Sequence, residues 1–204
     1  YEPIDPVRFI GNHSSGKMGF ALAEELADRG AEVKLVTGPV ALNSQHPGIK
    51  IERVSTAAQM AEACQHAFPV CDIAIMAAAV ADYTVLQPAS QKIKKVGNSL
   101  EIQLIPTTDI LAGLGQTKQK HQILVGFALE TENETVNALS KLQNKNLDLI
   151  VLNSLNDQGA GFGTNTNKVS MFAKNGLVNE TGLLPKTEIA AAIADTILSV
   201  TEAR

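Results

Sequence analysis

The chain has 204 residues, of which 45% are hydrophobic and 19% charged, and it contains no tryptophan. This composition is typical of a globular protein, and the length favours a single domain over residues 1–204. The formal net charge of −4 argues against a general nucleic-acid-binding surface, because such a surface needs a basic footprint to neutralise phosphates. Nucleic acid is therefore not an expected partner.

The two cysteines, Cys64 and Cys71, form no CxxC motif and have no cysteine or histidine set nearby, which argues against a zinc site. No secretory signal opens the chain, and apolar runs such as 73–80 are far shorter than the ~20 residues of a membrane-spanning helix. We therefore expect a cytoplasmic protein with free thiols and no membrane association.

The residue pattern predicts helices and strands in alternation. In chain order, it predicts a helix over 18–29, strands over 32–37 and 49–54, a helix over 55–68, a strand over 72–79, a hairpin of 92–96 with 100–104, a helix over 107–118, a strand over 122–127, a helix over 133–146, a strand over 148–153, a hairpin of 168–173 with 177–179, and a helix over 185–203. Residues 1–10 and 81–91 are predicted to be irregular. Helix caps are expected at Ser55 or Thr56 and at Thr107 or Thr108.

Buried strands that alternate with amphipathic helices indicate an α/β fold, with a doubly wound, mostly parallel Rossmann-like sheet and antiparallel hairpin additions. Residues 1–10 lead directly into the first helix, so the strand that usually precedes it is absent from the pattern. Ligands bind beyond the carboxyl ends of such strands. The loops after Val36, Ala79, Phe127 and Asn153 should therefore share one face.

Residues 11–19 read Gly-Asn-His-Ser-Ser-Gly-Lys-Met-Gly and open the first predicted helix. Free backbone N–H groups and the helix dipole favour an anion at such a position. The spacing nearly matches a P-loop, but Met18 stands where a P-loop has its magnesium-binding Ser or Thr, and no apolar strand precedes the segment. A serine-rich helix cap, with glycines for close packing, is the alternative, and spacing alone leaves both open.

The predicted central strand ends in small side chains, Ala77 to Ala79, with Asp82 shortly after them. Small side chains would let a nucleobase or ribose approach the backbone closely, whereas tight packing of a helix against the sheet is the alternative reason for an alanine run. Asp82 is a candidate for holding a ribose hydroxyl or a magnesium ion.

Two groups of lysines are candidates for binding phosphates. Residues 92–95, Lys-Ile-Lys-Lys, follow a strand-end loop and fit a mobile lid that closes cations over a polyphosphate. Lys141 and Lys145 are four residues apart and so share one helical face. A solvated surface is the alternative for each group.

Four segments together resemble the bacterial type of phosphopantothenate–cysteine ligase: DPVRFIGNHSSGKMG at 5–19, AAVADY at 78–83, KIKK at 92–95 and the lysine-rich stretch 141–148. Their order and spacing match over nearly the whole chain. This ligase is often the C-terminal half of a bifunctional protein whose N-terminal half is a flavin-dependent decarboxylase. The resemblance therefore implies FMN only where that upstream domain is present.

The resemblance implies a reaction in two steps. The carboxylate of 4′-phosphopantothenate attacks the α-phosphate of CTP, with Mg²⁺, to give an acyl-cytidylate and pyrophosphate. The amine of cysteine then displaces CMP. Magnesium and lysines are needed because charge shifts between oxygens during both steps.

The resemblance also implies roles for individual residues. As catalytic residues, Asn12 would hold the acyl phosphate and orient the incoming amine, and Lys92 would close onto the triphosphate in the first step. The residues implied in nucleotide binding are Ala78, Ala79, Asp82, Lys92, Thr107, Thr108, Asp109, Ile110, Phe127, Lys141 and Lys145. Those implied in substrate binding are Arg8, Asn12, Ser14, Ser15, Gly16 and Lys17. Asp82 is the candidate for magnesium.

The chain departs from the family pattern at two places. Thr107-Thr108 replaces the usual Asn-Pro at a phosphate-binding helix start, and a Gly-Gly-Thr turn after the first strand is missing, which should weaken nucleotide binding. The resemblance also implies a homodimer, in which Arg8 serves partly across the interface. A non-catalytic nucleotide-binding or assembly module is the alternative function. A nicotinamide oxidoreductase is disfavoured, because no G-x-G-x-x-G follows a predicted strand.

Overall fold

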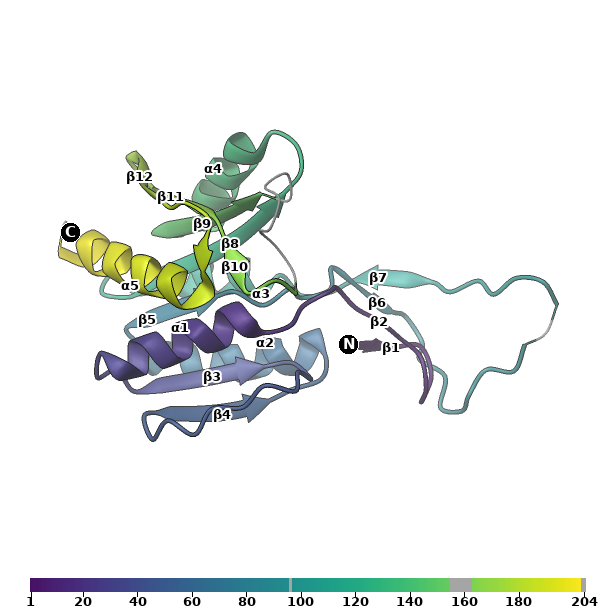
Figure 1. Ribbon diagram of the computed structural model, residues 1–204. Coiled ribbons are helices and arrows are strands. Elements are labelled where there is room, and N and C mark those ends of the chain that lie inside the picture. Colours follow the sequence, from purple (N-terminus) through teal and green to yellow (C-terminus); the bar gives the residue numbers. More distant parts are fainter. Residues whose placement is uncertain (96, 155–162, 203–204) are drawn as a thin grey trace.

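The structure, a computed structural model, describes residues 1–95, 97–154 and 163–202. At its centre is a five-stranded sheet in the order β12-β11-β9-β8-β5 (Figure 1). Strands β5, β8 and β9 run parallel, and β11 and β12 extend the sheet as an antiparallel hairpin. The bounds are Ile73–Met76 (β5), Ile123–Glu130 (β8), Leu149–Ser154 (β9), Val169–Ala173 (β11) and Gly176–Glu180 (β12). The predicted α/β class and the predicted terminal hairpin are confirmed.

A smaller parallel ladder lies beside this sheet. Strand β3 (Val33–Thr37) pairs with β4 (Ile49–Arg53), and neither forms a ladder with β5 in the part of the chain that the structure describes. The sheet is thus divided between β3 and β5. At the other end of the chain, β10 (Thr166–Asn167) pairs antiparallel with β13 (Leu184–Pro185).

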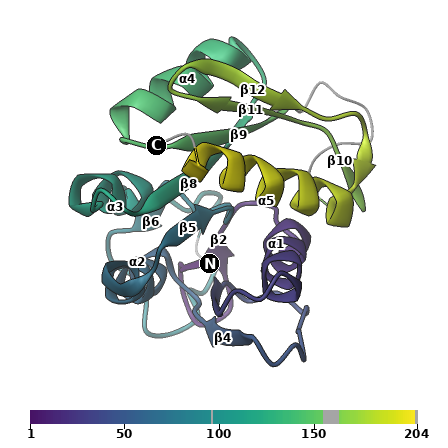
Figure 2. The ribbon, with the colours of Figure 1, turned by 90° about the vertical axis from the view of Figure 1, so that its left-hand side faces the viewer.

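Helices cover both faces of the main sheet (Figure 2). The helix bounds are Lys17–Asp28 (α1), Ala57–Ala67 (α2), Ile110–Thr117 (α3), Glu134–Asn144 (α4) and Lys186–Glu202 (α5), and a short 3-10 turn, Phe68–Val70, follows α2. Successive strand residues point to opposite faces. Leu124 therefore packs with residues of α2, α3 and α4, whereas Ile123 and Val125 pack with residues of α1 and α5. None of the helices in the described residues is long and apolar enough to cross a membrane.

A buried ion pair ties the end of α3 to the start of β9. The Lys118 ammonium donates to both carboxylate oxygens of Asp148, each at 2.9 Å, and the two side chains are 7% and 2% exposed. Asp148 also accepts a hydrogen bond from the backbone N–H of Leu124 in β8. The pair therefore satisfies its own charges and a strand amide within the core.

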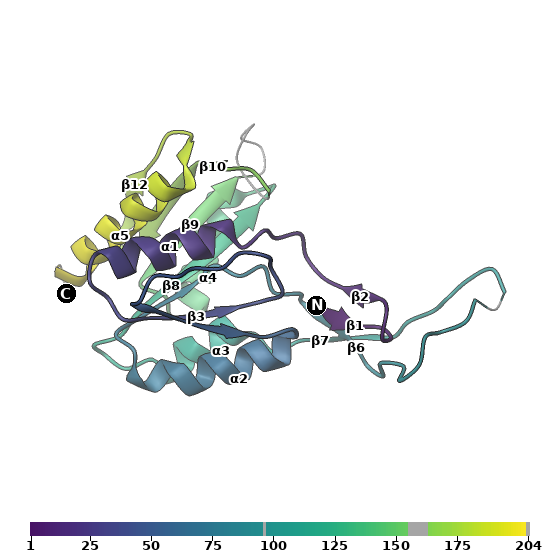
Figure 3. The same cartoon turned by 60° about the horizontal axis from the view of Figure 1, so that its bottom comes forward.

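Two features lie beyond the carboxyl ends of the parallel strands. Strand β1 (Glu2–Pro3) pairs with β2 (Phe9–Ile10), and β6 (Tyr83–Val85) pairs with β7 (Leu104–Pro106), both antiparallel. The connection between β6 and β7 projects away from the α/β body, as both views show (Figure 1, Figure 3). We call its residues 86–103 the arm.

The predicted hairpin of 92–96 with 100–104 is wrong. Lys92, Lys94 and Lys95 are exposed and lie in no strand, and position 96 lies outside the described residues. The ladder forms instead between β6 and β7, where Val85 is buried. A strand needs a face to bury, and within the described residues 92–95 the one apolar side chain is Ile93, which is half-buried.

Three further expectations need correction. Residues 1–10 and 81–91 were predicted to be irregular, but the first segment contains β1 and β2 and the second contains β6. Helix α3 begins at Ile110 and is capped by Asp109, whose Oδ1 accepts from the Ala112 N–H, so neither Thr107 nor Thr108 is the cap. Strand β5 ends at Met76 rather than at residue 79. The other predicted cap is confirmed, since Thr56 forms a complete capping box with Gln59 at the start of α2.

Candidate functional site

The exit of β5 lies against the loop that precedes α1. The side-chain amide of Asn12 donates a hydrogen bond of 2.9 Å to the backbone carbonyl of Val80. This contact joins two of the segments that the sequence singled out, 11–19 and 77–83. The site that we describe is centred on it.

The N-terminus of α1 is built around a glycine. Gly16 occupies the cap position with φ of 74°, and no side chain caps the helix. A Cβ at Gly16 would lie 3.1 Å from a Val40 methyl group, so the position requires glycine both for its backbone angle and for space. The Ser14 hydroxyl accepts only a long 3.4 Å contact from the Gly16 N–H, and Ser15 is half-buried. A serine cap is therefore wrong, and the close-packing role of the glycine is confirmed.

The side chain of Lys17 makes its hydrogen bonds with residues 163 and 165 and not with the β5 exit. Its ammonium donates to the carbonyl of Gly163 at 3.2 Å and to Oδ1 of Asn165 at 2.7 Å. Of the residues predicted to bind substrate from this segment, Asn12 is thus the one whose side chain is joined to the β5 exit.

Thr107 connects the end of β7 to the same exit. Its hydroxyl donates to the carbonyl of Ala81 at 2.7 Å, and its N–H donates to the carbonyl of Asp82 at 2.9 Å. Ala78, Asp82 and Thr108 are exposed, and Ala79 is half-buried. The carboxylate of Asp82 therefore faces solvent beside the strand exit, where a ligand can reach it.

Two ion pairs bring the predicted nucleotide residues of α3 and α4 together. Lys145 contacts Oδ2 of Asp109 at 2.8 Å, and Lys141 contacts Oε1 of Glu130 at 2.5 Å. Although burial opposes ionisation of Asp109, its hydrogen bonds with Lys145 and the Ala112 N–H lower the pKa of that carboxyl. The two lysines are therefore held at the sheet edge by separate acids.

Two of the residues predicted to bind the nucleotide have side chains that pack against the hydrophobic core. Ile110 is 5% exposed and belongs to the core cluster of α2, α3 and α4. Phe127 is half-buried and packs against the opposite cluster. A ligand would meet the backbone of Ile110 rather than its side chain.

Arg8 and Lys92 lie at the arm. Arg8 pairs with Asp5 and donates from Nη2 to the carbonyl of Ile93 at 3.0 Å. The hydrogen bond from Arg8, against the effect of burial, holds the pKa of the Asp5 carboxyl well below its ordinary range. Lys92 is exposed, and the contacts of the described residues do not join it to Asn12.

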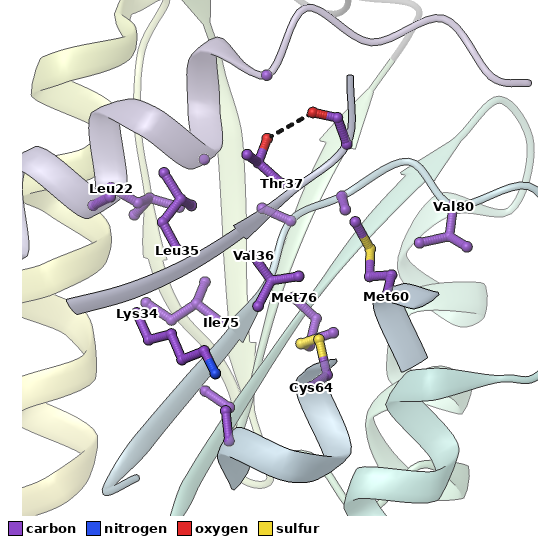
Figure 4. A pocket seen from close by; sticks show the side chains of 18 of the residues that line it. Leu22, Lys34, Leu35, Val36, Thr37, Met60, Cys64, Ile75, Met76 and Val80 are labelled. Carbon is purple, nitrogen blue, oxygen red and sulfur yellow. Dashed lines mark hydrogen bonds between the residues drawn. The ribbon is translucent and has the colours of Figure 1, made fainter. Parts of the chain in front are cut away.

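A cavity of about 1170 Å³ lies between β3 and β5. Figure 4 shows Leu35 of β3 beside Leu22 of α1, and Val36 on the other side of β3, toward Met76 of β5 and Met60 and Cys64 of α2. Burial, and then the charge of Glu52, raises the pKa of the Cys64 thiol to about 11. The interior of the cavity is thus chiefly apolar.

Polar residues line this cavity at both ends. Glu32, Lys34 and Asp72 lie near the amino ends of β3 and β5, whereas Gly11, Ser14 and the β5 exit from Ala77 to Ala81 form the mouth beyond the carboxyl ends. We therefore place the candidate site at this mouth, around Asn12 and Val80, and not on the apolar walls between the strands. No group of three or more His, Cys, Asp or Glu side chains suited to a metal occurs among residues 1–95, 97–154 and 163–202.

Three contributors escaped sequence reasoning. The Val80 carbonyl is a backbone group, which no residue pattern marks. Glu130 ends a parallel strand, and its position was a usable signal because polar residues at strand exits often face ligands. Asp5 precedes Arg8 by three residues, with Pro6 between them, and this arrangement is typical of an aspartate that accepts from its own following backbone.

Together, the fold and the Asn12 contact define an α/β protein with a polar site beyond the carboxyl end of a parallel strand. Residues 1–200 match the family described as the DNA/pantothenate metabolism flavoprotein C-terminal domain, DFP, and the chain belongs to this family.

Curated relatives include proteins with two different names. The chain is 54% identical over 199 residues to a cysteine/cysteine sulfinic acid decarboxylase from an unknown prokaryotic organism, covering 98% of this chain and 55% of that protein. It is 43% identical over 201 residues to the coenzyme A biosynthesis bifunctional protein CoaBC of Bacillus subtilis strain 168, covering 98% and 49%. The chain thus spans about half the length of the curated relatives it matches.

Solved structures agree with the fold. The C-terminal domain of a CoaBC protein is 40% identical, with a TM-score of 0.82, and the match covers 100% of this chain and 91% of that one. A mutant of Cab2 in complex with phosphopantothenate-cysteine is 16% identical, with a TM-score of 0.73, over 98% of this chain and 85% of that one. At that identity the likeness to Cab2 shows the fold alone.

Proposed function

We propose that this chain is the ligase unit that joins 4′-phosphopantothenate to L-cysteine in coenzyme A biosynthesis, through an acyl-cytidylate formed from CTP. The observation that carries the proposal is the Asn12 to Val80 hydrogen bond, which puts a side-chain amide at the exit of β5. Its support from relatives is the match to the CoaBC proteins and to the solved CoaBC C-terminal domain.

Asn12 has the chemistry that the second step needs. A carboxamide offers two N–H donors and a carbonyl acceptor, and the Val80 carbonyl takes one of the donors. The remaining N–H can donate to the acyl phosphate while the carbonyl oxygen accepts from the incoming amine of cysteine. Because Val80 fixes the amide plane, both groups are oriented before the ligand arrives, which lowers the cost of reaching the transition state.

The lysines of α4 suit the nucleotide. Lys141 and Lys145 are paired with Glu130 and Asp109, so their ammonium groups are held in place by these carboxylates. A triphosphate would compete with these carboxylates for the same cations. The small side chains of Ala78 and Ala79 leave room for the nucleoside beside the strand exit.

Mg²⁺ would fit this site when it is also bound by the phosphates of the nucleotide. Asp82 offers one exposed carboxylate, and the described residues hold no cluster of acids. Mg²⁺ commonly binds one or two carboxylates together with substrate phosphates. It would neutralise charge on the triphosphate, with Asp82 as its protein ligand. FMN would belong to an upstream decarboxylase domain.

A homodimer completes the proposal for Lys92. The arm projects away from the body of its own chain (Figure 1), and Lys92 is exposed on it. The arm of one subunit would therefore present Lys92 to the triphosphate in the site of its partner.

A non-catalytic nucleotide-binding or assembly module remains the second candidate. It is favoured by the cavity between β3 and β5, whose mouth includes the site, because a cavity of this size can hold a small-molecule ligand whether or not a reaction follows. The relative named as a decarboxylase adds a further activity to exclude, although the chain covers only 55% of that protein.

One assay separates these readings. Pyrophosphate release is measured with CTP, Mg²⁺, 4′-phosphopantothenate and cysteine, and then with each component left out. We expect pyrophosphate to require CTP and phosphopantothenate, and CMP release with amide product to require cysteine as well. Nucleotide binding without turnover would favour the module, and carbon dioxide release from cysteine alone would favour a decarboxylase.

A further inference from the structure

The arm is held by the N-terminal hairpin at one residue. Ile93 donates its N–H to Oδ2 of Asp5 at 3.1 Å and accepts at its carbonyl from Nη2 of Arg8 at 3.0 Å. Both backbone polar groups of this residue are thus bound by the same side-chain pair. Ile93 lies directly between Lys92 and Lys94, so whatever fixes its peptide also fixes where these lysines leave the backbone.

Both carboxylate oxygens of Asp5 accept hydrogen bonds within the protein. Its side chain is 0% exposed. Oδ1 accepts from the backbone N–H groups of Val7 and Arg8, and Oδ2 accepts from Nε and Nη2 of Arg8 and from the N–H of Ile93. A buried carboxylate is stable only when it is so paired, and hydrogen bonds to a charged group are stronger than neutral ones.

The hairpin that carries the pair is itself anchored. Oε1 of Glu2 accepts from the N–H of Ala57 at the start of α2, at 2.7 Å. The rings of Tyr1 and Phe9 stack with centroids 4.0 Å apart. Residues 1–12 therefore connect the body of the protein, the Ile93 peptide and the amide of Asn12 in one short stretch of chain.

We propose that Asp5 is a positioning residue for the lysines at 92–95. With Arg8 it forms a clamp on the Ile93 peptide, and the clamp sets the direction in which Lys92 and Lys94 present their ammonium groups to a polyphosphate. The identity of that ligand rests on the proposed function, whereas the clamp does not.

Trypsin tests the clamp without any substrate. Cleavage after Lys92, Lys94 or Lys95 requires this segment to leave the hairpin, so its rate follows the population of the opened arm. Asp5→Asn and Arg8→Gln should each raise these rates about tenfold or more, because each weakens a charge-assisted hydrogen bond to Ile93. Cleavage after Lys174, in the exposed turn between β11 and β12, is the internal reference and should not change.

Two further variants serve as comparisons for this test. Arg8→Lys retains a cation beside Asp5 but has one nitrogen in place of the guanidinium fork, so it should give an intermediate cleavage rate. Glu101→Gln removes an exposed carboxylate from the returning limb of the same arm and should leave cleavage unchanged. Equal rates at 92–95 in wild type, Asp5→Asn and Arg8→Gln would overturn the clamp.

Kinetics then test whether Asp5 acts through Lys92. Asp5→Asn should slow acyl-cytidylate formation and raise the KM for CTP. In the double variant Asp5→Asn/Lys92→Gln, the loss should be no greater than in Lys92→Gln alone, because residues that act as one unit are not additive. Fully additive losses would reduce Asp5 to a purely structural role. If the wild type fails to ligate, the proposed function fails, and the cleavage rates alone still decide the clamp.

Discussion

The side-chain amide of Asn12 lies 2.9 Å from the backbone carbonyl oxygen of Val80, although 68 positions separate the two in the chain. The contact fixes the loop before α1 against the exit of β5.

Asn12→Asp should block the second step while sparing the first. A carboxylate cannot donate to the Val80 carbonyl or to an acyl phosphate, and loss of one oriented donor commonly costs about 10²–10³ in rate. Acyl-cytidylate and pyrophosphate should therefore form, while the amide product falls by that factor. Quenched-flow analysis with labelled CTP measures both. Amide formation at the wild-type rate would remove Asn12 from the mechanism.

Lys92→Gln should act on the first step instead. The change removes a cation expected to stabilise the triphosphate as pyrophosphate leaves, which should slow acyl-cytidylate formation about 10²-fold or more. Mixing this variant with Asn12→Asp tests the partner-subunit arrangement, since a mixed dimer contains one site with neither change. Recovery of activity on mixing supports that arrangement, and normal acyl-cytidylate formation by Lys92→Gln alone would contradict a role for Lys92.

Lys118→Met should strongly destabilise the fold. It leaves Asp148 charged, unpaired by its lysine and only 2% exposed, and breaking such a pair typically costs about 3–5 kcal/mol. Urea unfolding measures the loss. The control is Lys34→Met, whose pair with Glu52 is 41% and 43% exposed, and which should cost about 1 kcal/mol or less. Equal losses in the two variants would show that burial does not govern these pairs.

Gly115→Ala should disturb the contact between α3 and the end of α4. An added Cβ would lie 2.0 Å from the carbonyl oxygen of Lys145, so backbone must move, at a cost of about 1–3 kcal/mol. The shift should also weaken nucleotide binding through Lys145. Gly113→Ala, in the same helix with nothing within 4 Å of the added Cβ, should be neutral or stabilising. Urea unfolding and nucleotide titration of both variants check this, and similar behaviour of the two would refute the packing argument.

Cys64 should make stability fall at alkaline pH. Burial raises the pKa of its thiol from 9.0 to about 11, so the folded state keeps the proton that the unfolded chain releases. The resulting stabilisation is complete below pH 9 and is lost as the pH rises through about 11. The free energy of unfolding should therefore fall more steeply between pH 9 and pH 11 in the wild type than in Cys64→Ala. Parallel curves would mean that the thiol titrates normally in the folded protein.

Local patterns in the sequence determined most of the elements. The alternation of apolar residues predicted the helices and the buried strands, and Thr56 with Gln59 marked the start of α2. Close packing of glycines in the 11–19 segment was one of two alternatives that the sequence left open, and it holds for Gly16. These features are readable because their cause lies within a few residues of chain, in side-chain periodicity, capping and backbone freedom.

Only the tertiary structure decided how those pieces meet. It brought Asn12 to a backbone carbonyl, paired Lys141 and Lys145 with separate acids, and placed Ile93 on Asp5 and Arg8. The hairpin expected at 92–96 and 100–104 is replaced by the antiparallel pairing of β6 with β7. Such contacts join residues from different elements, and each forms because the fold brings its two partners side by side. No local sequence pattern predicts these contacts.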